Sequence, residues 1–240
     1  MKIKNLHDWQ LSVADAKQIQ NRLAGQVSRR SEPIEPRFVG GVDISAPDSA
    51  GMARSAAVVV SYPELEIAEI ETAEGKLNFP YIPGLLSFRE VPLILAALGQ
   101  LSIEPDLIMV DGHGIAHPRR FGIASHLGLL LEIPTLGCAK SRLCGNHSPV
   151  PSKAGAFSEL TDNGEVIGAV LRSKVGVRPI YISIGHRIDL LTAIQRVMNC
   201  CRNYRLPEPS RLAHLAASGR YTTIPASRTL DQFQSKSLWT

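Results

Sequence analysis

The feature that most constrains this chain is a short apolar run, residues 107–110, that ends in Asp111. Pro105 and Gly112 bound the run, and its length and partly β-branched character predict a buried strand rather than a helix. Asp111 would then lie at the carboxyl end of the strand, where open α/β sheets place their ligands. Because a buried carboxylate is costly without compensation, the histidines and arginines of residues 113–120 suggest a metal ion, a phosphate or both nearby.

Hydrophobic periodicity and turn residues divide the rest of the chain into helices and strands. Residues 145–164, rich in Ser, Pro and Gly, predict a surface excursion, and residues 222–240 predict a loosely ordered tail. The predicted elements are a helix at 8–28, strands at 37–45, 54–62 and 65–72, a helix from 87, the strand ending in Asp111, a helix at 121–131, strands at 134–138, 166–171 and 179–184, and helices at 189–204 and 208–218.

This order of elements predicts an α/β fold. Three strands joined by short links indicate an antiparallel meander, and the β-α-β unit that follows indicates parallel neighbours with right-handed crossovers. We therefore expect a ribonuclease H-like mixed central sheet flanked by helices. The 240 residues suit one domain spanning 1–240.

Composition limits the class of protein, its possible partners and its expected compartment. The formal net charge is +4 and hydrophobic residues make up 44% of the chain, which is compatible with a packed core and with a nucleic-acid partner. The four cysteines include no CxxC pair, so a zinc site or a disulfide framework is not expected. Without an apolar leader or an apolar run of membrane-spanning length, we expect a cytoplasmic monomer with no membrane partner.

Three acids in separate segments form the candidate metal site. Asp43 lies between Val42 and Ile44 in the first strand, so it points away from its apolar neighbours, and the first and fourth strands are expected to be adjacent. Two carboxylates there require a cation or a shared proton, although either could instead pair with an arginine or cap a turn. Glu90 is the third acid, but Ser87 and Glu90 also match a capping box, which would explain Glu90 without a metal.

Several basic groups accompany these acids. Magnesium prefers oxygen ligands such as a few carboxylates, and two such ions could activate water and stabilise a leaving oxygen. Lys140 follows a predicted strand end, which suits a phosphate, although a solvated lysine is the simpler explanation. His117 closely follows Asp111, whereas His113, between two glycines, could be an ordinary loop residue. His214 shares a helix face with Arg211 rather than with the leucines, so it is not an obvious core histidine.

A loop of residues 79–84 completes the candidate site. Pro80 and Pro83 stiffen it, and Tyr81 and Ile82 stand between them. A rigid loop that displays an aromatic and an aliphatic side chain has the character of a wedge inserted between stacked bases. The alternative is a loop that packs onto its own core.

Together these segments resemble the endonuclease V (deoxyinosine 3′ endonuclease) family. The resemblance covers nearly the whole chain to about residue 218, and its two long motifs are specific. The matching segments are residues 41–43 (GVD), 80–90 (PYIPGLLSFRE), 111–120 (DGHGIAHPRR), 137–140 (GCAK), 183–187 (SIGHR) and 204–209 (YRLPEP).

The resemblance implies a Mg²⁺-dependent DNA repair endonuclease, with Mn²⁺ as a possible substitute. Such an enzyme recognises deoxyinosine and hydrolyses the second phosphodiester bond on its 3′ side, leaving 3′-hydroxyl and 5′-phosphate ends. The acids at 43, 90 and 111 would hold the metal. His214 would be an additional catalytic residue, although some members carry Asp there.

The resemblance also implies roles in binding the substrate. Residues 80–83 would part the strand at the lesion, with Tyr81 at the tip. Lys140 and His117 would contact the cut phosphate or support the site. The turn formed by Gly112, His113 and Gly114 would help to enclose the flipped base, and Arg119 would contact nucleic acid.

Two alternatives to DNA cleavage remain open on the sequence. One is an inosine-specific ribonuclease, since no clear reader of the 2′-hydroxyl is visible either way. The other is a lesion-binding protein without nuclease activity, against which the three intact acids argue.

Overall fold

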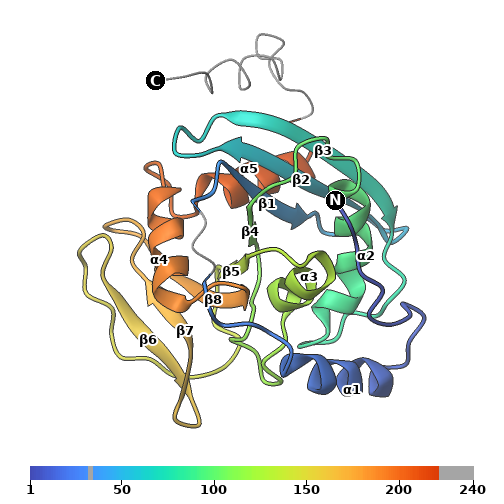
Figure 1. Ribbon diagram of the computed structural model, residues 1–240, viewed down its shortest axis with the longest axis horizontal. Coiled ribbons are helices and arrows are strands. Elements are labelled where there is room, and N and C mark those ends of the chain that lie inside the picture. Colours follow the sequence, from blue (N-terminus) through green and yellow to red (C-terminus); the bar gives the residue numbers. More distant parts are fainter. Residues whose placement is uncertain (32–34, 222–240) are drawn as a thin grey trace.

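In the computed structural model, the described residues are 1–31 and 35–221, so the predicted tail at 222–240 lies outside them. The described chain forms one eight-stranded mixed sheet with the order β3-β2-β1-β4-β5-β8-β7-β6 (Figure 1). The strands are β1 (Phe38–Ile44), β2 (Met52–Ser61), β3 (Ile67–Lys76), β4 (Leu107–Val110), β5 (Thr135–Ala139), β6 (Phe157–Asp162), β7 (Glu165–Leu171) and β8 (Ile180–His186). The helices are α1 (Val13–Ala24), α2 (Leu86–Leu98), α3 (Ile123–Leu131), α4 (Leu190–Asn199) and α5 (Glu208–Ala217).

The first five strands confirm the predicted ribonuclease H-like plan. β1, β2 and β3 form an antiparallel meander, and β3 is an edge strand of the sheet. β4 then pairs parallel with β1 on one side and with β5 on the other. The first and fourth strands are therefore neighbours, as the placement of the two acids requires.

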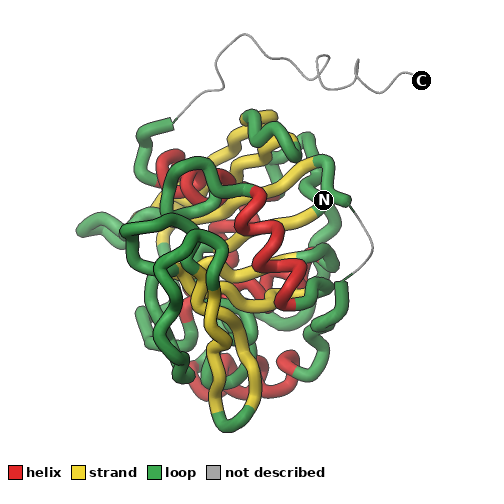
Figure 2. The backbone as a smooth tube through the Cα atoms, turned by 90° about the vertical axis from the view of Figure 1, so that its left-hand side faces the viewer, coloured by secondary structure: helices red, strands yellow, loops and turns green. Residues whose placement is uncertain are grey.

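The second half of the sheet corrects one expectation. β7 and β8 form the antiparallel pair that the sequence indicated, but β6 arises inside the predicted surface excursion and pairs with β7. Asn163 and Gly164 both adopt positive φ between these two strands, which is the two-residue hairpin turn that an Asn-Gly pair favours. In Figure 2 this hairpin projects beyond the rest of the sheet.

Helices cover both faces of the sheet, so the core has two main parts. Residues of α4 and α5 pack with one set of strand residues, including Val39 and Met109. Residues of α2 and α3 pack with the alternate set, including Val42 and Ile108. All four residues of β4 are buried for this reason, and their lack of alternation is the signature of a strand covered on both faces.

The first helix packs beside α2 and α3 rather than against the strands. Ala16, Ile19 and Leu23 of α1 join Phe88 and Phe121 in a third apolar cluster. A capping box between Ser12 and Asp15 fixes the start of this helix. In the described part of the chain, every helix falls short of the length and apolarity needed to cross a bilayer.

Candidate functional site

The pairing of β1 with β4 brings Asp43 and Asp111 together. The last paired residues of these parallel strands are Val42 and Val110, and each acid is the next residue along its strand. Both acids therefore leave the sheet at the same edge, at the carboxyl ends of two central strands. Their side chains are 10% and 13% exposed, so both carboxylates are largely removed from water.

Helix α5 reaches this edge because β1 carries a glycine there. A Cβ built on Gly41 would lie 2.1 Å from the carbonyl oxygen of Pro209, which is far inside van der Waals contact, so only glycine lets the helix approach so closely. Asp43 lies on the same face of β1, two residues further along. The next turn of α5 therefore carries His214 over Asp43.

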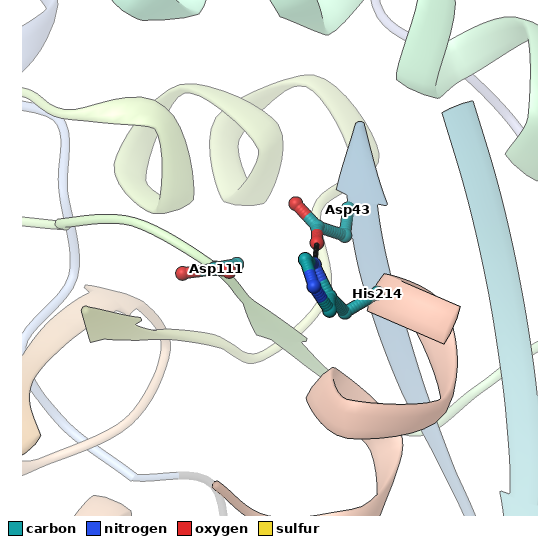
Figure 3. Close-up of side chains that lie close together, drawn as sticks. All are labelled: Asp43, Asp111 and His214. Atoms are coloured by element: carbon teal, nitrogen blue, oxygen red, sulfur yellow. Dashed lines mark hydrogen bonds and ion pairs between the residues drawn. The ribbon is translucent and has the colours of Figure 1, made fainter. Parts of the chain in front are cut away.

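Three potential ligands meet at this point, as Figure 3 shows. One ligand atom from each of Asp43, Asp111 and His214 lies within 4.8 Å of the other two. Nδ1 of His214 is 2.7 Å from Oδ2 of Asp43, and the other carboxylate oxygen accepts the backbone N–H of Ile44 at 2.8 Å. Oxygen and imidazole donors at this spacing form a candidate metal site.

Burial and mutual repulsion disfavour full ionisation of this group of acids. Burial raises the pKa of Asp43, and the nearby Asp111 carboxylate raises it further, whereas bonds from Ile44 and His214 and the charge of Lys140 oppose the shift. Burial likewise raises the pKa of Glu90 to about 8, with added repulsion from both aspartates. Glu90 therefore lies within electrostatic reach of the pair, although it is outside the group of three close ligands. A cation would relieve this repulsion.

Lys140 supplies one positive charge in the described structure. It follows the last residue of β5, and its Nζ donates to Oδ2 of Asp111. Its side chain is 40% exposed, so the ammonium group neutralises the acid and also faces solvent. That position suits an amine shared between a carboxylate and a substrate phosphate.

The capping box predicted for Ser87 and Glu90 is wrong. Helix α2 has Leu85 at its N-cap position with no side-chain hydrogen bond there, and Oγ of Ser87 is buried without a hydrogen-bond partner among the described residues. Leu85 is fully buried, so packing of its side chain, rather than a polar cap, fixes the start of the helix. The local explanation for Glu90 therefore falls away.

The proline-braced loop stands beside the acids. Tyr81 is 72% exposed, and this loop and the turn after β4 line a cavity of about 350 Å³ together with residues 139–143. The predicted site residues that line the cavity are Tyr81, Ile82, Pro83, Asp111, Gly112, His113, His117 and Lys140. The cavity therefore connects the predicted wedge, the predicted base pocket and one of the acids.

His117 and Arg119 hold the base of this loop. Nε2 of His117 donates to the Gly84 carbonyl oxygen at 2.9 Å, and Nη2 of Arg119 donates to the same oxygen at 2.8 Å. Nδ1 of His117 accepts the backbone N–H of Arg119, so the neutral ring carries its proton on Nε2. Burial lowers the pKa of His117 to about 4, and neighbouring arginines contribute. These contacts support the site, and a contact of either residue with substrate stays a prediction.

The turn after β4 is packed tightly against the protein itself. A Cβ on Gly114 would lie 1.9 Å from the carbonyl oxygen of Ile184, and one on Gly112 would lie 2.5 Å from a methyl of Ile123. Nε2 of His113 is 3.0 Å from the carbonyl oxygen of Ser141. The glycines thus allow close packing within the protein. The sequence analysis had instead linked them to the enclosure of a flipped base.

Comparison with known proteins identifies the family. The sequence model of endonuclease V matches residues 21–215. The chain belongs to the endonuclease V family. An endonuclease V from Dehalococcoides mccartyi is 50% identical over 218 residues, which cover 91% of this chain and 98% of that protein.

Solved endonuclease V structures share the fold described above. The crystal structure from Streptomyces avermitilis has a TM-score of 0.84 and 37% identity, covering 91% of this chain and 97% of that one. The Ciona intestinalis endonuclease V, solved in complex with a 24mer DNA containing an inosine followed by a ribo-adenosine, has a TM-score of 0.75 and 28% identity. It covers 86% of this chain, and the match spans 96% of that one.

Sequence reasoning gave no role to Gln20, which lines the cavity. Gln20 lies on the buried face of α1, where it is 1% exposed, and its side chain reaches the wedge loop. The available signal was its polarity, because a buried polar side chain must find hydrogen-bond partners.

Proposed function

We propose that this endonuclease V family member is a metal-dependent DNA repair endonuclease that acts at deoxyinosine. It would hydrolyse the second phosphodiester bond 3′ to the lesion and leave 3′-hydroxyl and 5′-phosphate ends. One observation carries the proposal. The group formed by Asp43, Asp111 and His214 lies beside a cavity that is lined by Asp111 and by the loop that carries Tyr81. The inosine-containing DNA in the complex of the Ciona relative supports the choice of substrate.

The donor set fits a divalent cation. The carboxylates of Asp43 and Asp111, with Glu90 nearby, provide the oxygen ligands that Mg²⁺ prefers, and burial together with repulsion from both aspartates raises the pKa of Glu90. We propose Mg²⁺, with Mn²⁺ as a substitute, because both ions favour carboxylate ligands. When bound, such an ion supplies positive charge that stabilises the reacting phosphate and favours activation of water.

The residues around the acids have complementary tasks in this proposal. Lys140, already paired with Asp111, would bind the phosphate to be cut through its exposed ammonium group. His214 holds the carboxylate of Asp43 in one orientation through its 2.7 Å contact. The cavity beside the turn after β4 would receive the flipped base, which enzymes acting on nucleobases extrude from the stack. Tyr81, exposed at the rim, would fill the space that the base leaves.

The test is cleavage of a duplex that carries a single deoxyinosine. We expect a Mg²⁺-dependent nick at the second bond 3′ to the lesion, and its absence with both Mg²⁺ and Mn²⁺ would refute the proposal. Asp43→Asn and Asp111→Asn keep the size of the side chain but remove its charge, so each should abolish cutting and retain binding to the lesion. Asp48→Asn is the matched control, because Asp48 lies in the loop between β1 and β2 and accepts the backbone N–H groups of its neighbours Ala50 and Met52.

The same assay separates two alternatives. An inosine-specific ribonuclease would cut a matched RNA strand faster than the DNA strand, and the ribo-adenosine after the inosine in the Ciona complex makes this comparison worthwhile. A lesion-binding protein without activity would bind inosine duplexes but cut neither strand with any metal.

We also propose that the protein acts as a cytoplasmic monomer. The free, buried thiols of Cys138 and Cys200 fit a reducing compartment.

A further inference from the structure

Gln20 lies on the buried face of α1, and both the nitrogen and the oxygen of its side-chain amide make hydrogen bonds. Its Nε2 donates to the carbonyl oxygens of Gly84 and Phe121, each at 2.9 Å. Its Oε1 accepts from Nε of Arg119. Three polar contacts from a side chain that is 1% exposed satisfy a group that would otherwise be costly to bury.

The two carbonyl groups belong to two separate segments at the 350 Å³ cavity, each of which forms part of its wall. Gly84 ends the loop that carries Tyr81, and Phe121 precedes Gly122 and Ile123 of the wall at the start of α3. Gln20 also lines the cavity itself. One rigid amide group therefore spans the two walls and fixes how far apart they lie.

The span is anchored at both ends. The Gly84 oxygen also accepts from His117 and Arg119, so three donors converge on the end of the wedge loop. The ring of Phe121 is fully buried in the cluster that also holds Ile19 and Leu23 of α1. Both walls thus contact neighbouring positions of α1, and the side chain of Gln20 is bonded to both of them.

We propose that Gln20 is a positioning residue that sets the width of the cavity and thereby determines which bases the enzyme accepts. The inference rests on the proposed function, since it assumes that the cavity receives a base. It concerns a residue outside the segment 21–215 that matches the family. Gln20 would act through Gly84 and Phe121, not by contact with the reacting atoms.

The chemistry of the amide is specific for this task. Gln supplies two N–H donors and one carbonyl acceptor, whereas Glu supplies only acceptors when ionised and Met supplies neither strong donors nor strong acceptors. Gln20→Met keeps the length of the side chain but removes the hydrogen bonds that link it to both walls. Gln20→Glu keeps the acceptor for Arg119 but places oxygen against the carbonyl groups of Gly84 and Phe121.

The experiment compares the variants on a duplex with one inosine and on undamaged duplexes, one of which has guanine at the position of the inosine. For Gln20→Met, we expect the KM for the inosine duplex to rise about tenfold, equivalent to about one net hydrogen bond. We expect kcat at saturating DNA to change less than about twofold, because only binding is affected. The preference for inosine over undamaged DNA, measured by binding in EDTA, should fall by a similar factor.

The control is Gln100→Met. Gln100 also donates to two backbone carbonyl oxygens, those of Thr72 and Ala96, both at 3.1 Å, but it does not line the cavity. We expect its KM, kcat and selectivity to match those of the wild type. Should Gln20→Met fail to fold, as judged by circular dichroism, Gln20→Glu provides the same comparison with an isosteric polar side chain.

The outcomes separate this inference from the proposed function. A wild-type enzyme that cuts at inosine while the folded Gln20 variant keeps the wild-type KM and selectivity would overturn only the role of Gln20. A loss of kcat at unchanged KM would also overturn it. A wild type that neither binds nor cuts inosine duplexes would overturn both proposals, whereas raised KM with reduced selectivity supports both.

Discussion

Nδ1 of His214 lies 2.7 Å from Oδ2 of Asp43 although 171 positions separate the two residues along the chain. The contact depends on two local features, the glycine that admits α5 against β1 and the helical turn that carries the imidazole forward. Neither feature concerns the chemistry of the acids themselves. The position of the imidazole therefore depends directly on how α5 packs against the sheet.

Removal of the imidazole tests this contact. In His214→Ala, the Asp43 carboxylate loses a donor that holds its orientation, and we expect cleavage to fall about 10- to 100-fold, as for other lost partners of metal ligands. His214→Asp restores an anionic ligand and should retain more activity than His214→Ala, with a larger benefit from added metal. Single-turnover rates measure both effects. His147→Ala serves as the control, because His147 lies between β5 and β6, contacts the carbonyl oxygen of Ser148 and does not line the cavity. Wild-type rates for His214→Ala would contradict the assignment.

The close approach of α5 to β1 gives a second prediction. In Gly41→Ala, the new Cβ would lie 2.1 Å from the Pro209 oxygen, so α5 must shift and the free energy of unfolding should fall by about 1–3 kcal/mol. Cleavage should fall as well, because His214 moves with the helix. Chemical denaturation and the inosine assay measure the two effects. Gly25→Ala is the control, since a Cβ there meets nothing within 4 Å, and equal losses in both variants would contradict the packing argument.

The raised pKa of Glu90 predicts a pH-dependent stability that a metal reverses. Folding of the metal-free protein favours the protonated acid, so this stabilisation is fully present below the ordinary pKa of a glutamate. It is lost as the pH rises through about 8. Glu90→Gln should therefore raise the Tm in EDTA at pH 9, and the gain should vanish near pH 4.

Divalent metal supplies the second half of that test. Mg²⁺ should raise the Tm of the wild type at pH 9 more than that of Glu90→Gln, because only the wild type regains a favourable partner for its third carboxylate. Glu159→Gln, at an exposed position of β6, provides the control for loss of charge alone. An identical metal response in wild type and Glu90→Gln would remove Glu90 from the metal site.

The exposed aromatic of the wedge loop gives a fourth prediction. Tyr81→Ala should weaken binding to the inosine duplex about tenfold, since an aromatic that stacks with bases contributes on the order of 1–3 kcal/mol. The rate of cutting at saturating DNA should change much less. Leu191→Ala is a suitable control because Leu191 is similarly exposed, at 68% compared with 72% for Tyr81, but lies on α4. Equal binding by both variants would exclude a wedge role for Tyr81.

The sequence was sufficient to predict what depends on local order. Alternation along β1 placed Asp43 away from Val42, and the sequential order of the strands placed β1 beside β4. The helix predicted from residue 189 is likewise local, since Asp189 is its N-cap and accepts the backbone N–H of Thr192. Such features follow from one or two adjacent elements, so a single sequence contains the necessary information.

Features that depend on distant packing were out of reach. Ser87 matches the pattern of a helix cap, but α2 begins at Leu86, with the buried Leu85 at its N-cap position. Glu69 of β3 is a charged residue, yet it is 8% exposed and accepts the backbone N–H groups of Ser102 and Ile103, which lie more than 30 positions away. Gln20 shows the same limit, because its partners are 64 and 101 positions away.

The helix that carries His214 is the last element of the described chain to leave the ribosome. A nascent chain that has been made only through β8 already contains Asp43 and Asp111, but it lacks the imidazole and the helix that covers β1. Translation that stops early therefore yields a fragment with exposed acids and an incomplete cutting centre.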